Sequence, residues 1–165
     1  MKQFPMRIVT AVVVLAALVV GIAFAQEAAS GKQPPTDQDA ISMVGARVAK
    51  VFARFGAPAD ISAVDVTSDE PKVCLDYGAF GYLVDNKTVR ACMFWPDWTG
   101  NVCGVKLGDS ADAAIKKLGK PESTSKANDG TQKMYWNYKA NDEIMSLQLS
   151  FNKDQKCTRV SLSVQ

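Results

Sequence analysis

The chain has 165 residues, with 19 lysines and arginines, 17 aspartates and glutamates, and no histidine. The lack of histidine removes the commonest general base and the commonest metal ligand in proteins. The first 25 residues hold two of the basic residues and no acidic ones, so the rest of the chain carries 17 of each sign and is neutral. A neutral domain lacks the electrostatic footprint of nucleic-acid binding or of attraction to an anionic membrane.

Residues 1–25 have the pattern of a secretory signal peptide. The stretch 8–20 is apolar except for one threonine, and Ala23-Phe24-Ala25 is a cleavage motif. The sequence therefore predicts cleavage after Ala25 and export to the periplasm or the medium. The alternative is an uncleaved anchor in the inner membrane, because residues 21–24 could lengthen the apolar stretch toward the ~20 residues that a spanning helix needs.

Four cysteines follow in the exported part: Cys74, Cys92, Cys103 and Cys157. An even number of cysteines in an oxidising compartment favours disulfides. A turn at residues 96–99 would place Cys92 opposite Cys103 if its flanks run antiparallel, which leaves Cys74 to pair with Cys157. Spacing alone leaves the other pairings open. Without a CxxC motif or histidine, a metal site is disfavoured, and we expect no metal and no cofactor.

Residues 26–37 are small and polar and predict a linker. A first α/β repeat is expected over residues 38–100. Its helix is predicted by apolar residues at spacings of three and four, and Gly56 and Pro58 mark its end. That apolar stripe consists of Ile41, Val44, Val48, Val51, Phe52 and Phe55.

Residues 59–71 are expected to form a loop, followed by strands at 72–77, 82–85 and 88–95. Strict alternation in the last of these strands would place Val89, Ala91, Met93 and Trp95 on one face, and Thr88, Arg90, Cys92 and Phe94 on the other. This parity directs Trp95 into the core and Phe94 to the uncovered face of the sheet.

A second repeat is expected over residues 101–165. A helix at about 111–118 is predicted after Asp109 or Ser110, with Gly119 ending it. A polar loop over 122–131 precedes three strands. Their core-facing residues are predicted to be Met134, Trp136, Tyr138, Met145, Leu147, Leu149, Phe151, Val160, Leu162 and Val164. Their other face carries Ser146, Gln148, Ser150, Arg159, Ser161 and Ser163.

One short phrase occurs in both halves, as Phe55-Gly56-Ala57-Pro58 and, 63 residues later, as Leu118-Gly119-Lys120-Pro121. A shared period of this size indicates one structural unit used twice. Because the strands alternate between apolar and polar residues, one sheet face must be uncovered. The sequence therefore predicts an α+β fold of two tandem helix-plus-antiparallel-meander repeats, with the helices covering one face and the other face open.

The stretch Gly104-Val105-Lys106-Leu107-Gly108-Asp109-Ser110, together with the aromatic strand 135–138 and the closing hairpin 156–160, resembles small exported bacterial domains. These are the outer-membrane assembly lipoproteins of the BamE (SmpA/OmlA) type and proteins of the β-lactamase-inhibitor type. The resemblance covers residues 104–165 and, as a degenerate copy, 41–95. It implies binding of other proteins rather than turnover of substrates. The cysteine that carries the lipid in the lipoproteins is absent, and no contact residue of the inhibitors can be matched.

The sequence thus predicts an exported, non-catalytic protein-binding module, inhibitor-like by its resemblance, that holds an envelope or extracellular protein partner. Its candidate contact residues are Trp98, Phe94, Tyr135 and Arg159, since aromatic residues and arginine are common interface anchors. The structural alternative for Trp98 is that it folds over the boundary between the two repeats. The alternative function is a membrane-tethered structural or assembly component of the cell envelope.

No catalytic residue is predicted. Ser123 and Lys126 match a serine–lysine spacing but belong to a polar stretch. The acidic pairs Asp37 with Asp39 and Asp142 with Glu143 are explained by helix capping and by a turn. A hydrolase remains open only if two carboxylates from distant loops meet in one cleft.

Overall fold

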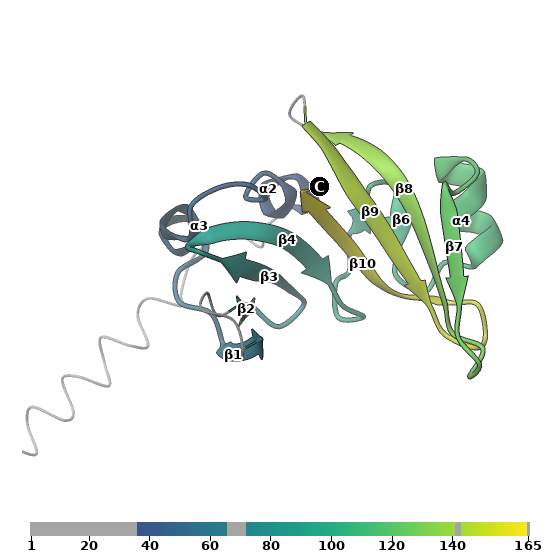
Figure 1. Ribbon diagram of the computed structural model, residues 1–165, viewed down its shortest axis with the longest axis horizontal. Helices are drawn as coiled ribbons and strands as arrows, with labels where there is room; N and C mark the ends of the chain where they lie inside the picture. The colour runs from purple at the N-terminus through teal and green to yellow at the C-terminus, as the bar shows by residue number, and fades with distance from the viewer. Residues whose placement is uncertain (1–35, 66–71, 141–142, 165) are drawn as a thin grey trace, which may run out of the picture. The chain divides into compact units, whose positions relative to one another are not determined.

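The computed structural model describes residues 36–65, 72–140 and 143–164, which form an eight-stranded antiparallel sheet, a small hairpin and three short helices (Figure 1). The predicted signal peptide, its cleavage site and nearly all of the predicted linker lie outside these residues. Within the described ranges, no helix is both long enough and apolar enough to cross a membrane.

The helices are α2 (Asp37–Ile41), α3 (Val48–Phe55) and α4 (Ala111–Leu118). Thr36 begins α2 in a capping box with Asp39, and the Ser110 hydroxyl begins α4 by accepting from the Ala113 amide at 3.2 Å. The sequence predicted a single helix along the first apolar stripe. The chain instead turns between α2 and α3 at Gly45, whose φ of 85° suits glycine, and the stripe is divided between two helices.

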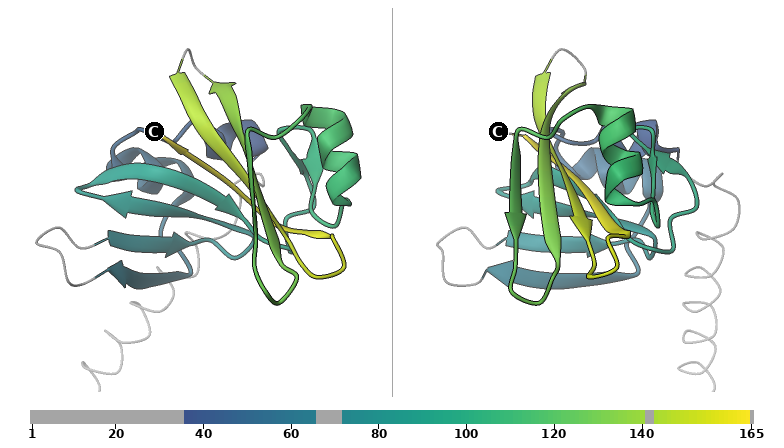
Figure 2. Two further views of the ribbon diagram at one scale, coloured as in Figure 1. Left: turned by 45° about the vertical axis from the view of Figure 1, so that its right-hand side comes forward. Right: turned by 90° about the vertical axis from the view of Figure 1, so that its right-hand side faces the viewer.

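The strands of the large sheet are β1 (Asp60–Asp65), β2 (Lys72–Asp76), β3 (Phe80–Asp85), β4 (Thr88–Phe94), β7 (Ser123–Lys126), β8 (Gln132–Ala140), β9 (Glu143–Phe151) and β10 (Cys157–Val164). Their order across the sheet is β1-β2-β3-β4-β10-β9-β8-β7. The strands at the two ends run in different directions because the sheet is strongly twisted (Figure 2). A separate hairpin consists of β5 (Asn101–Val102) and β6 (Val105–Lys106).

The predicted α+β fold of two tandem helix-plus-meander repeats is wrong. The protein is mostly β, with one continuous sheet, because β4 pairs with β10 from Phe94 opposite Val160 to Ala91 opposite Ser163. Two of the strands, β1 and β7, lie where the sequence predicted loops. Both are edge strands whose residues remain exposed, so neither shows the alternating apolar pattern from which a strand is predicted.

All three helices pack on the same face of the sheet. The Tyr82 hydroxyl on β3 donates to the Ala40 carbonyl of α2 at 3.0 Å, and the Phe55 ring of α3 lies 5.4 Å from the Phe80 ring. At the other end, Ala111 and Ala114 of α4 belong to the same core. From β8 to β10 the core consists of Met134, Trp136, Met145, Leu147, Leu149, Phe151, Cys157, Val160 and Leu162. The predicted inward alternation of these three strands is confirmed.

The repeated phrase serves the same local purpose in both halves. Gly56 and Gly119 end α3 and α4 with φ values of 81° and 83° and ψ near 180°, a conformation that only glycine adopts readily. An aromatic side chain then donates to the carbonyl of each glycine, from the Tyr77 hydroxyl to Gly56 and from Trp136 Nε1 to Gly119, both at 3.0 Å. Each phrase therefore fixes the end of a helix to a strand.

A β-bulge in β4 changes the direction of its side chains. Val84 pairs with Val89, but the preceding residue Leu83 pairs with Ala91, so Arg90 is an extra residue on β4. The core face therefore receives Val89 and then Cys92, three positions later. The strict alternation that the sequence predicts is therefore interrupted at Arg90.

Candidate functional site

The side chains that point away from the helices form a surface that we call the open face. Cross-strand pairing arranges them in rows of adjacent residues. One row is Asp60–Asp76–Gly81–Met93–Ser161–Gln148–Tyr135–Ser123, and the next is Ser62–Cys74–Leu83–Ala91–Ser163–Ser146–Asn137. A further row is Arg159–Ser150–Lys133–Ser125. The apolar residues of the first two rows come from β3 and β4, and most of the residues on the flanking strands are polar or charged.

The apolar part of the open face lies on β3 and β4. Leu83, Met93 and Trp95 are partly exposed there, and Ala91 between them is only 5% exposed. Ala91 is the one buried hydrophobic residue, among those described, that does not join the core cluster. Its neighbours on the open face therefore already exclude water from the centre of this patch.

The Trp95 indole occupies space that is free because residue 81 is glycine. A Cβ at Gly81 would contact the Trp95 indole at Cη2 and would lie 2.6 Å from the Leu75 carbonyl oxygen. The indole thus packs directly over the glycine of the neighbouring strand, on the open face. The predicted parity is reversed here: because of the bulge at Arg90, Trp95 lies outside and Phe94, which was predicted to be a contact residue, is 0% exposed in the core.

The polar part of the open face lies on β8, β9 and β10. Tyr135 is partly exposed between Ser123 and Gln148, and Arg159 is exposed opposite Ser150. The Gln148 amide donates to the Ser150 hydroxyl at 3.3 Å. Tyr135 and Arg159 are thus on the surface where the alternation placed them, and their role in binding stays a prediction.

Trp98 is not on the open face. Its ring lies 4.8 Å from Phe94 and 5.7 Å from Phe80, both edge to face, so it extends the core. Its Nε1 is buried and has no hydrogen-bond partner among the described residues. Trp98 is partly exposed while it packs against the core, and its role as a contact residue stays a prediction.

All four cysteines carry free thiols. The predicted Cys74–Cys157 disulfide is wrong because β3 and β4 lie between β2 and β10. Three strand spacings amount to about 14 Å, whereas the Cα atoms of a disulfide are less than about 7 Å apart. The two residues cannot be joined while the sheet is intact.

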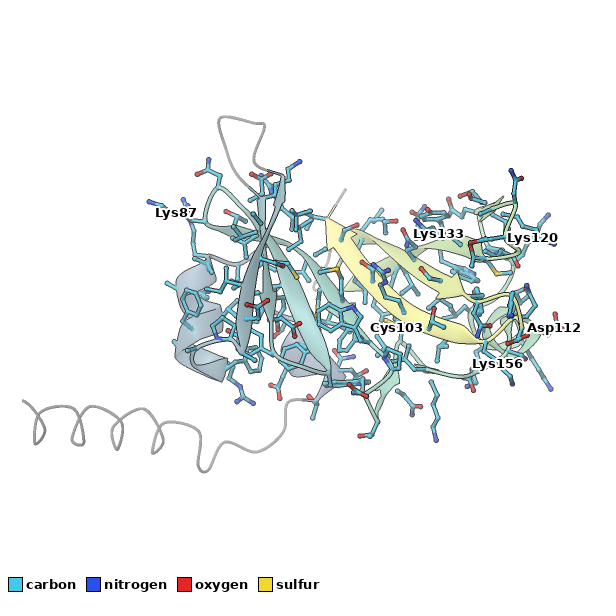
Figure 3. The ribbon with its side chains drawn as sticks, turned by 90° about the horizontal axis from the view of Figure 1, so that it is seen from below. Lys87, Cys103, Asp112, Lys120, Lys133 and Lys156 are labelled. Carbon is cyan, nitrogen blue, oxygen red and sulfur yellow. The ribbon has the colours of Figure 1, made fainter. Side chains whose placement is uncertain are left out.

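Cys92 does not lie opposite Cys103 across an antiparallel turn as predicted, because its cross-strand partners are Tyr82 and Leu162. Cys103 lies instead in the β5–β6 turn with a φ of 52°, near the middle of the view in Figure 3. Burial raises the pKa of the Cys92 thiol, and the nearby Cys103 thiol raises that pKa further. The Cys92–Cys103 disulfide therefore stays a prediction, on grounds of proximity rather than of strand pairing.

The serine–lysine spacing and the first acidic pair lie on separate, short elements. Ser123 and Lys126 begin and end the exposed strand β7, and residues three apart on a strand point to opposite faces. Asp39 caps α2, and the hydrogen bond from the Thr36 amide to its carboxylate lowers the pKa of Asp39. In the described residues, no group of three or more potential ligands is placed to hold a metal ion. Asp142 lies outside them.

No family model and no curated protein matches the chain. Among solved structures, the chain is similar to an extracellular protein containing an SCP domain from Bacillus anthracis, with a TM-score of 0.53 and 12% identity over 82% of this chain and 49% of that one. It is also similar to YjgB, a DUF4309 family protein from Bacillus subtilis, with a TM-score of 0.51 and 17% identity over 79% and 86% of the two chains.

A cysteine-rich secretory protein from Staphylococcus aureus gives a TM-score of 0.47 and 15% identity, with 75% of this chain and 45% of that one covered. The chain thus spans about half the length of the Bacillus anthracis and Staphylococcus aureus proteins. At these identities the first two structures show a shared fold and nothing more.

Proposed function

We propose that the chain is an exported, non-catalytic binding module that holds a protein partner on its open face. The observation that carries this proposal is the apolar patch of Leu83, Ala91, Met93 and Trp95 on a sheet face against which none of the described helices packs. A patch of this kind, beside a polar surface, is typical of a protein–protein contact.

Trp95 is the proposed anchor. Because its indole packs over Gly81, little side-chain freedom is left to lose when a partner binds. Tyr135 and Arg159 provide polar contacts on the other side of the face. Tryptophan, tyrosine and arginine are the residues most enriched among those that dominate binding energy.

The composition of the rest of the face argues for a protein as the partner. Serines, Gln148 and Tyr135 offer neutral hydrogen-bonding groups beside the exposed Lys133 and Arg159, and the exported part of the chain has no net charge. Nucleic acids and anionic membranes favour proteins with an excess of positive charge, whereas residues 26–165 have a net charge of zero. A folded protein with an apolar centre and a polar rim complements this surface.

Export is supported by the pattern of residues 1–25 and by the description of the Bacillus anthracis protein as extracellular. Mass spectrometry of the protein recovered from its native source tests this part of the proposal. A chain that begins at Gln26 in the soluble exported fraction is the expected result. A chain that retains residues 1–25 in the membrane fraction would instead support the membrane-tethered envelope component.

Binding is tested by capturing the partner from the exported fraction and measuring its affinity for variants. Trp95→Ala is expected to weaken binding by about 2 kcal/mol, roughly 30-fold, and Tyr135→Ala by about tenfold. Lys116→Ala, on the exposed side of α4, is the control and should leave affinity unchanged. Equal affinities of all three variants for the partner would contradict the proposal that the open face binds it.

A further inference from the structure

A second surface of the molecule has the features of a binding site. β1 ends the sheet and pairs with β2 on one side only (Figures 1 and 2). Its Ile61 is 57% exposed and its Val64 is 58% exposed, which makes them two of the three large apolar residues that are more than half exposed among those described. An edge strand with exposed apolar residues is a template on which another strand can pair.

The edge strand at the other end of the sheet differs in this respect. β7 consists of Ser123, Thr124, Ser125 and Lys126, all exposed, and exposes no apolar residue. Polar, short edge strands that end in lysine are a common protection against unwanted pairing. β1 has no lysine and no proline within it, so its edge is the open one.

The charges beside β1 indicate what it would pair with. Asp60 lies directly opposite Asp76 on β2, which places two carboxylates next to each other. None of the three ion pairs found in the described part of the chain involves either residue. A partner that brings a cation to this end of the strand would relieve the repulsion between them.

We propose that β1 accepts an extended, basic segment of a partner protein as an additional strand of the sheet. Backbone hydrogen bonds along β1 supply affinity, and alternate apolar side chains of the segment contact Ile61 and Val64. A lysine or arginine of the segment lies against Asp60 and Asp76. Asp60 and Asp76 continue the row of Gly81 and Met93 on the open face, so this contact adjoins the edge of that face, whereas Ile61 pairs with Leu75 on the opposite side of the sheet.

A second copy of the chain is a poorer occupant of this edge. β1 begins and ends with aspartate, so antiparallel pairing of two β1 strands places aspartates opposite each other at both ends. Like charges directly opposite each other destabilise strand pairing.

The probe for this proposal is a fluorescent seven-residue peptide of alternating valine and threonine with a lysine at each end. Its affinity for the purified exported protein is measured by anisotropy, and amide hydrogen exchange shows where it binds. A second peptide with the same side chains and N-methyl groups on alternate amides cannot pair as a strand. A third peptide has glutamate in place of both lysines.

We expect the first peptide to bind, to slow hydrogen exchange along β1, and to bind about tenfold more weakly to Ile61→Lys. The N-methylated peptide and the glutamate peptide should each bind the unaltered protein at least tenfold more weakly than the first peptide does. Ile144→Lys is the matched control, since Ile144 is 60% exposed on β9, and it should leave affinity within about twofold.

Three results would overturn the proposal. The first is equal binding of the N-methylated peptide, and the second is slowed exchange outside β1. The third is a dimer in sedimentation that Ile61→Lys abolishes while no peptide binds, which would assign the edge to a second copy. This proposal and the proposed function can fail separately. Ile61→Lys can lose peptide binding while partner capture on the open face stays intact, or it can keep peptide binding while partner capture is lost.

Discussion

At the scale of single residues, Gly81 determines the shape of the open face. Its missing side chain lets the Trp95 indole lie on β3. Gly81→Ala is expected to destabilise the protein by about 1–3 kcal/mol, because the new Cβ meets the Leu75 carbonyl, which is backbone and cannot move aside. Urea unfolding measures this change. Ser62→Ala, at an exposed position on β1, is the control, and an equal effect of both would contradict this packing.

The thiols are a second test at this scale. Burial raises the pKa of Cys157 to about 11 and that of Cys103 to about 12, and the folded state therefore binds these protons more tightly than the unfolded state. Their contribution to stability is complete below the unfolded thiol pKa of about 8.5 and is lost as the pH rises through 11–12. The free energy of unfolding of the reduced protein should fall from about pH 9 upward.

Thiol counting completes this test. In denaturant, protein with four free thiols reacts with four equivalents of an alkylating reagent, whereas protein with a Cys92–Cys103 disulfide reacts with two. Below pH 9 the folded protein should react slowly at Cys92, Cys103 and Cys157, because their thiolates are rare. Rapid alkylation of Cys92 in the folded protein would contradict its burial.

At the scale of elements, the indole of Trp136, which donates a hydrogen bond to the end of α4, can be compared with the indole of Trp98, whose Nε1 has no partner among the described residues. Trp136→Phe removes the bond to the Gly119 carbonyl, whereas Trp98→Phe removes a similar area and no hydrogen bond among the described residues. We expect Trp136→Phe to destabilise the protein by roughly 1 kcal/mol more than Trp98→Phe in thermal unfolding. The opposite order would show that the hydrogen bond does not hold α4.

The helix ends themselves give another prediction. At Gly119 a Cβ has nothing within 4 Å, so Gly119→Ala affects only the backbone conformation, with a φ of 83°. A loss of about 1–3 kcal/mol is expected from that strain. Lys120→Ala, at the next and exposed position, is the control. Equal stability of both variants would mean that α4 ends elsewhere.

Some elements could be predicted from the sequence and others could not. The helix α4 and the strands β8, β9 and β10 each bury one face, and their apolar spacing therefore shows them. The edge strands β1 and β7 bury too little to have such a pattern. In β4 the pattern was present but misread, because the bulge at Arg90 is one extra residue that alternation alone does not reveal.

At the scale of the whole molecule, the pairing of β4 with β10 joins both halves into one sheet and one core. We therefore expect circular dichroism and tryptophan fluorescence to show a single unfolding transition. Leu162→Ala, at a fully buried position on β10, should lower the stability of the whole protein by about 2–5 kcal/mol. Two separate transitions would contradict a shared core.

Only part of the candidate site could be predicted from the sequence. Tyr135 and Arg159 lie on the surface where alternation placed them, since β8 alternates regularly around Tyr135 and β10 alternates from Arg159 onward, after a register shift between Cys157 and Arg159. Trp95 was missed and Phe94 was predicted in its place, because their order depends on the bulge. The packing of Trp98 against Phe80 and Phe94 depends on long-range contacts that no local pattern contains.

Photo-crosslinking tests most directly whether the open face holds a partner. Benzoylphenylalanine is placed at Met93, at Ser161 opposite it on β10, and at Lys116 on the exposed side of α4, in the protein produced by its native source. We expect the first two positions to yield an adduct with one and the same protein, and Lys116 to yield none. Adducts that form equally at Lys116, or that fail to form at both positions on the open face, would contradict the proposed function.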